Sequence, residues 1–137
     1  MAEMSNFKYK ILLIDSESES RNSIIKILNN EGYVFDIESS AENGFKRFRK
    51  QHYDLIISEI RPADEEMSGL DLLKKIRENE SNIPFIVISD LTSVEISVRA
   101  VNYGVAGYLV KPIQTNQARE TIRRALRYQK GRLRSRE

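Results

Sequence analysis

Polar side chains that could handle a phosphoryl group and a metal ion follow four short apolar runs of the chain. Carboxylates, hydroxyls and an ammonium group stand directly after these runs, in the segments Asp15-Ser16-Glu17, Ser58-Glu59, Ser89-Asp90 and Lys111-Pro112. Carboxylate oxygens are the ligands that Mg²⁺ prefers, and an ammonium group stabilises negative charge on a transferring phosphoryl group. If the four runs end at one place, these side chains form a candidate phosphoryl site.

Short apolar runs rich in Ile, Val, Leu and aromatic residues predict buried β-strands, and the spacing between them predicts amphipathic helices. The strands are expected at Ile11–Ile14, Tyr33–Ile37, Leu55–Ile57, Phe85–Ile88 and Tyr108–Val110. The core-facing helix positions are expected at Ile24, Ile27 and Leu28, at Ala41, Phe45 and Phe48, at Leu70, Leu73 and Ile76, at Val94, Val98 and Val101, and at Ala118, Ile122, Ala125 and Leu126.

Capping signals agree with these elements. A hydroxyl residue followed three positions later by glutamate is typical of a capping box, in which both side chains satisfy free amides of the first turn. Such pairs are Ser16 with Glu19, Ser39 with Glu42, and Thr92 with Glu95, and the first of them predicts that Ser16 caps a helix. Gly32 and Gly104 are placed to end helices in a left-handed conformation.

The alternation of strand and helix predicts an α/β fold, a doubly wound parallel sheet with helices on both faces, which makes a three-layer sandwich. Parallel strands end on the same edge of the sheet, and such sheets bind ligands where the strand order reverses. In the order 2-1-3-4-5 the first and third strands are neighbours, so Asp15 and Glu59 converge. We expect Ser89 and Lys111 to flank them.

Four segments, in order and at suitable spacing, resemble the receiver domain of bacterial response regulators. They are "ILLIDSE", "DLIISEI" with "GLDLLKKIR", "IPFIVIS" and "GVAGYLVKP", and the resemblance covers roughly residues 8–128. It implies a flavodoxin-like (βα)5 fold and a role in two-component phosphorelay signalling, without catalytic turnover.

The resemblance also implies roles for individual residues. Asp15 is the first acid of the pocket, and Ser89 is the hydroxyl that binds the phosphoryl group and shifts when it arrives. Lys111 contacts a phosphoryl oxygen, and its bond to Pro112 is expected to be cis. Tyr108 matches the aromatic switch that swings inward on activation.

Three departures from the family pattern point to a degenerate phosphoacceptor pocket, a pseudo-receiver. Glu59 stands where the family has its acceptor aspartate, and misplacement of a nucleophile by about 1 Å costs on the order of a hundredfold. Ser16 replaces an acid that ligates Mg²⁺, so we expect no cofactor and a weakened Mg²⁺ site. The loop "RPADEEMSG" carries Pro62 and leaves the position of the Arg61 carbonyl, the usual last metal ligand, open.

Two interpretations of Glu59 stand side by side. Its carboxylate can imitate part of a phosphoryl group toward Lys111 and Ser89, although it carries a charge of −1 against about −1.5 to −2. Alternatively, it pairs with Lys111 and only neutralises a buried ammonium group. His52 has no partner histidine in the sequence and is expected in a surface turn.

The leading functional hypothesis is an interaction module whose partner is a sensor kinase or a downstream signalling protein. Its partner surface, which could also form a homodimer, consists of the fourth helix, fifth strand and fifth helix, with candidates at Glu95, Arg99, Asn102, Arg119 and Arg123. A second hypothesis is a Mg²⁺-dependent receiver that is phosphorylated on Glu59 or Asp64. A small flavodoxin-like enzyme is disfavoured because no glycine-rich phosphate loop follows the first strand.

Composition sets the remaining bounds. The 137 residues suit one domain, and the absence of cysteine excludes disulfides and thiolate chemistry. No segment approaches the roughly 20 apolar residues of a membrane span, and the polar start lacks a signal peptide, so we expect a cytoplasmic protein. Residues 119–137 hold eight Lys or Arg against two Glu. We expect a domain at 1–128 and a basic tail or linker at 129–137, with nucleic-acid contact through that end as a third hypothesis.

Overall fold

The computed structural model describes residues 8–60, 69–79, 81–89 and 100–136, with side chains up to residue 127. The elements are β1 (Lys10–Ile14), α2 (Ser18–Glu31), β2 (Val34–Glu38), α3 (Ala41–Lys50), β3 (Leu55–Glu59), α4 (Gly69–Glu78), β4 (Phe85–Ser89), β5 (Gly107–Val110) and α6 (Thr115–Arg136). All the strand pairs are parallel and the order is β2-β1-β3-β4-β5, which confirms the predicted doubly wound sheet.

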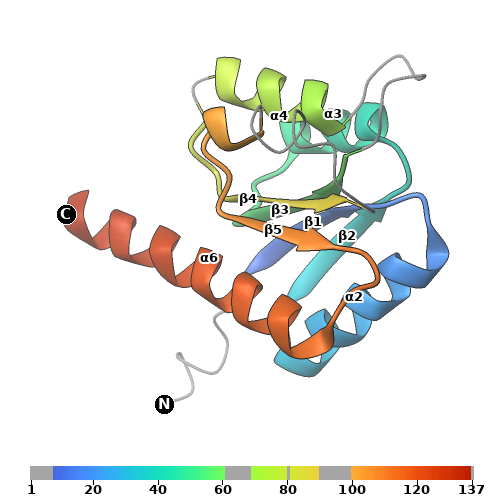
Figure 1. Cartoon of the computed structure of the whole chain (residues 1–137). Coiled ribbons are helices and arrows are strands. Elements are labelled where there is room, and N and C mark those ends of the chain that lie inside the picture. Colours follow the sequence, from blue (N-terminus) through green and yellow to red (C-terminus); the bar gives the residue numbers. More distant parts are fainter. Residues whose placement is uncertain (1–7, 61–68, 80, 90–99, 137) are drawn as a thin grey trace.

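The sheet lies between two helical layers, with α2 and α6 on one face and α3 and α4 on the other (Figure 1). Successive strand residues point to opposite faces. Ile11 and Leu13 of β1 therefore pack with the residues of α2 and α6, whereas Leu12 and Ile14 pack with those of α3 and α4. Strands β3 and β4 are buried along their whole length because both of their faces are covered. This burial fixes the carboxyl ends of the central strands.

The helix ends correct two of the predicted capping boxes. Helix α2 begins at Ser18 with Glu17 as its N-cap, so Ser16 does not cap it. Helix α3 is capped by Ser40, which accepts a hydrogen bond from the Asn43 amide at 3.2 Å, and not by Ser39. The Thr92 and Glu95 pair lies outside the described residues. Gly32 and Gly104 have φ values of 77° and 74°, so the predicted left-handed caps are confirmed.

The predicted core-facing helix positions hold with one exception among the described residues, while Val34, Ile37 and Val110 of the predicted buried strands are exposed. Val101 was expected in the core but is 64% exposed. It belongs to a helical segment at residues 100–102, in which Ala100 makes the buried contact instead. Phe45 and Phe48 are partly buried against the cluster beneath α3 and α4. Val94 and Val98 lie outside the described residues.

Helix α6 is anchored along its first part and continues well beyond it. Its residues Ala118, Ile122, Ala125 and Leu126 are buried against the sheet. The helix runs without a break to Arg136, across the expected boundary at residue 128, and its last turns extend past the sheet (Figure 1). The domain boundary itself stays a prediction. No helix in the described ranges is both long enough and apolar enough to cross a membrane.

Two arginines that we expected on a partner surface are engaged within the domain. Arg123 donates two hydrogen bonds to Glu31 of α2, at 2.6 and 3.0 Å, and the Arg119 Nε atom lies 3.9 Å from the same carboxylate. This pairing lowers the pKa of Glu31. Arg119 is only partly exposed, whereas Asn102 is exposed as expected. Glu95 and Arg99 lie outside the described residues.

Gly69 sets the approach of α4 to the end of β3. A Cβ atom at this position would clash with the Glu59 carbonyl oxygen and lie 3.1 Å from the Ile60 Cα atom. Because backbone cannot move aside as a side chain can, Gly69→Ala should lower the free energy of unfolding by about 1–3 kcal/mol in denaturant titrations. Gly44→Ala is the comparison, because there the added methyl group meets side-chain atoms of the buried Ile14 instead of backbone atoms. Equal losses for the two variants would contradict this account.

Candidate functional site

The carboxyl edge of the sheet brings the predicted pocket residues together. Asp15 follows β1, Glu59 and Ser89 end β3 and β4, and Lys111 follows β5. All four side chains are largely buried: relative exposure is 0% for Asp15, 9% for Glu59 and 7% for Ser89, and 10% for the Lys111 side chain. Such a concentration of buried polar groups needs mutual hydrogen bonds or ion pairs.

Both oxygens of the Glu59 carboxylate have partners. Oε1 accepts hydrogen bonds from the Ser16 backbone N–H at 3.0 Å and from the Ser16 hydroxyl at 2.7 Å. Oε2 lies 3.4 Å from the Lys111 Nζ atom. Ser16 therefore bridges the ends of β1 and β3 through Glu59, and this is the role it has in place of the expected helix cap.

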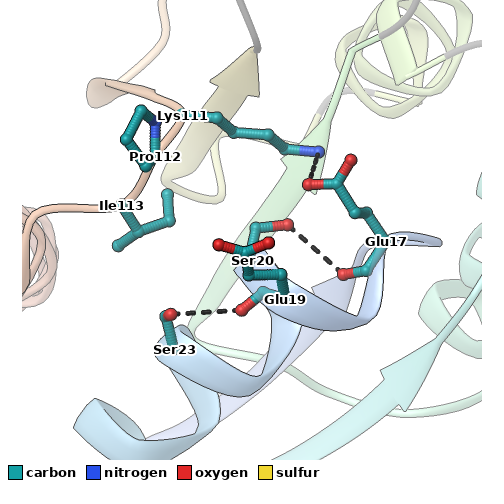
Figure 2. A pocket seen from close by; sticks show the side chains of 7 residues that line it. All are labelled: Glu17, Glu19, Ser20, Ser23, Lys111, Pro112 and Ile113. Atoms are coloured by element: carbon teal, nitrogen blue, oxygen red, sulfur yellow. Dashed lines mark hydrogen bonds and ion pairs between the residues drawn. The ribbon is translucent and has the colours of Figure 1, made fainter.

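Lys111 lies among three carboxylates. Its Nζ atom is 3.4 Å from Glu59 Oε2, 3.5 Å from Glu17 Oε1 and 3.7 Å from Asp15 Oδ1. Figure 2 shows the Glu17 carboxylate reaching from the start of α2 to the lysine. The sequence analysis placed Glu17 among the polar residues after the first strand but gave it no role of its own. The signal that could have identified it is an acidic residue two positions past Asp15, at the start of the first helix.

A cavity of about 310 Å³ opens beside Lys111, between the start of α2 and the segment that follows β5 (Figure 2). Its walls are acidic and hydroxylic on the helix side and apolar at Pro112 and Ile113. The Lys111–Pro112 peptide bond is cis, as expected. The cavity gives solvent and small solutes a route to the edge of the pocket.

Asp15 is the most deeply buried acid of the pocket. Its Oδ1 atom accepts a hydrogen bond from the Glu17 N–H at 3.0 Å, and its Oδ2 atom accepts one from the buried Ser20 hydroxyl. Burial raises the pKa of Asp15, and Glu59 raises it further, while the hydrogen bonds from Ser20 and Glu17 act in the opposite direction. Ser20 is a second site residue that the sequence analysis did not identify.

The raised pKa of Asp15 gives a testable dependence of stability on pH. The folded carboxyl group keeps its proton to a higher pH than the unfolded one, whose value is near 3.8, so the group destabilises the fold as pH rises through the folded pKa. Asp15→Asn should therefore raise the free energy of unfolding at pH 7 by on the order of 1 kcal/mol. The substitution should also remove the decline of the free energy of unfolding with rising pH, as measured by denaturant titrations from pH 4 to pH 7. A variant less stable than the parent at pH 7 would contradict the prediction.

The expected weakening of the Mg²⁺ site stays a prediction, with which the hydrogen bonds of Glu59 agree. Mg²⁺ requires hard oxygen ligands in near-octahedral geometry, and here the Glu59 Oε1 atom already accepts two hydrogen bonds from Ser16. Within the described part of the chain, no three His, Cys, Asp or Glu side chains are grouped to hold a metal ion. Asp64, Pro62 and the Arg61 carbonyl lie outside the described residues, so their expected roles stay predictions.

The remaining predicted residues have clear positions. Tyr108 is half-buried and packs against the cluster under α3 and α4, and Ser89 is buried at the end of β4. The switch roles of both stay predictions. The side chain of His52 is 81% exposed and lies 3.3 Å from Asp54, which confirms the expectation of a surface residue.

Comparison with known proteins establishes the family. A model of the response regulator receiver domain matches residues 11–123. The chain belongs to the response regulator receiver domain family, the signalling modules of two-component systems.

Individual relatives agree with this assignment. A crystal structure of a CheY-like receiver domain protein from Methanospirillum hungatei JF-1 superposes with a TM-score of 0.83 at 27% identity, covering 92% of this chain and 99% of that one. The transcriptional regulatory protein ZraR of Salmonella typhimurium is 29% identical over 87% of this chain, and CusR of Escherichia coli K12 is 28% identical over 86%. The chain spans only 26% of ZraR and 51% of CusR.

Proposed function

We propose that this receiver domain relays a signal by protein–protein interaction and is not phosphorylated at position 59 in the ordinary way. The observation that carries the proposal is the engagement of both Glu59 oxygens, by Ser16 on one side and Lys111 on the other. An attacking carboxylate oxygen must be aligned with the incoming phosphorus atom. Here the nucleophile position is held by three donors instead.

The two substitutions at positions 16 and 59 support the proposal together. Ser16 provides a hydroxyl where a charged metal ligand is missing, and the longer side chain of Glu59 reaches that hydroxyl directly. The 2.7 Å hydrogen bond thus joins the ends of β1 and β3 without a cation. We infer that this direct bridge stands in place of the bridge that Mg²⁺ provides between two carboxylates.

A titration with beryllofluoride and Mg²⁺, followed by ¹H–¹⁵N NMR of the whole chain, tests the proposal. Beryllofluoride imitates a phosphoryl group on a carboxylate and needs the metal. We expect no saturable shift of the backbone amide signals of Asp15, Ser89 and Lys111. Saturable shifts at these amides would overturn the proposal, and the variant with Ser16→Asp and Glu59→Asp is the positive control.

Tyr108 bears on the first interpretation of Glu59, a domain held in one switch state without phosphorylation. Its ring is half-buried and packs against the cluster under α3 and α4, which suits an aromatic switch as well as a half-exposed strand residue. We propose that the contact between Glu59 and Lys111 supports this position. In Glu59→Gln the ring should lose its contacts with that cluster in NOE spectra and affinity for a partner should change. An unchanged ring would leave Glu59 as a neutralising partner of Lys111 only.

We propose that the partner is a sensor kinase or a downstream signalling protein, the two classes that the family suggests. The face formed by residues 100–102, β5 and α6 is a candidate for such contacts or for a homodimer, because Val101 and Val110 are 64% and 41% exposed there. Arg119 and Arg123 are not proposed as partner contacts, because both are paired with Glu31 within the domain.

A further inference from the structure

The Ser16 hydroxyl has the surroundings of an activated nucleophile. A nucleophile is recognised by a base within about 2.6–3.2 Å of its oxygen and by a third group that orients the base. Ser16 Oγ donates to Glu59 Oε1 at 2.7 Å, and Lys111 Nζ lies 3.4 Å from Glu59 Oε2. The backbone N–H of Ser16 holds the same carboxylate oxygen at 3.0 Å, so the geometry of the base is fixed from three directions.

We propose that Ser16 accepts a phosphoryl group from an acyl phosphate or a phosphohistidine and becomes phosphoserine. The Oγ atom attacks phosphorus and forms the new P–O bond, while the bond from phosphorus to the leaving carboxylate or imidazole breaks. The hydroxyl proton passes to Glu59 Oε1 and then to the leaving group or to water. The inference rests on the proposed function in one respect: Glu59 must be a proton acceptor rather than the phosphoryl acceptor.

The charges around Ser16 change favourably during this step. Before transfer, Lys111 is paired with Glu59 and faces Glu17 and Asp15 as well, an excess of negative charge that opposes an incoming phosphoryl group. When Glu59 takes the proton it loses its charge and its hold on Lys111. The ammonium group is then available to the oxygens of the transferring group, where charge develops.

Accessibility selects Ser16 over the other hydroxyls of the pocket. Ser16 is exposed, so a donor can reach its oxygen. Ser20 is buried and donates its hydrogen to Asp15, and Ser89 is buried at the end of β4. Ser18 is exposed as well, but it begins α2 one position beyond the N-cap. Ser18 is therefore a matched control from the same segment.

Labelling of the whole chain with ³²P-acetyl phosphate tests the proposal, because phosphoserine resists hydroxylamine whereas an acyl phosphate does not. We expect a hydroxylamine-resistant label, located by peptide mass spectrometry on Ser16. It should be absent in Ser16→Ala, reduced by on the order of a hundredfold in Glu59→Gln, and unchanged in Ser18→Ala. Thermal unfolding verifies that each variant is folded, and the mapping on the unmodified chain needs no variant.

The possible failures are distinct. An unlabelled chain, or a resistant label on any residue other than Ser16, would overturn the Ser16 proposal and leave the proposed function standing. A hydroxylamine-sensitive label on Glu59 would overturn both. An unchanged labelling rate in Glu59→Gln would remove Glu59 as the base and with it the mechanism proposed here.

Discussion

A chain in which Ser16 and Glu59 are both replaced by aspartate should accept a phosphoryl group at position 59 at least about a hundredfold faster than the unmodified chain. The shorter side chain withdraws the carboxylate from the place that it occupies between Ser16 and Lys111. The added acid at position 16 supplies the metal ligand that the pocket lacks. The rate of hydroxylamine-sensitive labelling by acetyl phosphate, with and without Mg²⁺, measures the effect.

The single variants are the controls for this gain. Ser16→Asp alone places a carboxylate against Glu59 Oε1, and Glu59→Asp alone leaves Ser16 as a poor metal ligand. Each single variant should gain much less phosphorylation at position 59 than the double variant, because the effects of substitutions at residues in direct contact are not additive. If the double variant gains hydroxylamine-sensitive label no faster than the parent, the degeneracy lies outside these two positions.

The second large effect is expected from Lys111→Met. Removing the ammonium group takes away the cation that faces Asp15, Glu17 and Glu59, two of which are buried. Loss of one partner from a buried ion pair costs about 3–5 kcal/mol, so the free energy of unfolding should fall by about 3 kcal/mol in denaturant titrations.

A second substitution tests the cause of that loss. If it arises from unpaired negative charge, Glu59→Gln added to Lys111→Met should recover part of the stability, while Glu59→Gln alone should destabilise the chain. Lys74→Met, on the exposed side of α4, should stay within about 0.5 kcal/mol of the parent. Equal losses with and without Glu59→Gln would show that packing of the lysine stem is responsible.

The fold was predictable because buried strands and helices produce regular patterns of apolar residues in the sequence. Short runs such as Ile11–Ile14 and Phe85–Ile88 are apolar on both faces, as a strand covered by helices on both sides requires. The edge strand β2 fitted less well: it lies at Val34–Glu38, one residue later than expected, because its exposed residues weaken the pattern. Helix ends shifted by similar amounts, since several hydroxyl residues compete for each cap.

The residues of the site and the pairing of Glu59 with Lys111 were predictable, but the hydrogen bonds of Glu59 to Ser16 were not. Strand ends identified Asp15, Glu59, Ser89 and Lys111, because parallel strands finish at one edge. Whether the Glu59 side chain also meets Ser16 depends on distances of a few ångströms, which residue spacing does not contain. Glu17 and Ser20 were missed for the same reason, and the exposed Val101 has a spacing that fits a buried helix face equally well.

The reach of α6 has a mechanical consequence. Its buried part is seated on the sheet up to Leu126, and Arg123 ties it to Glu31 of α2. The helical residues beyond Leu126 add about 15 Å to the length of the helix at 1.5 Å per residue. A tilt of the seated part, for example on loss of the tie to Glu31, would be amplified at the distal end as at the tip of a lever arm.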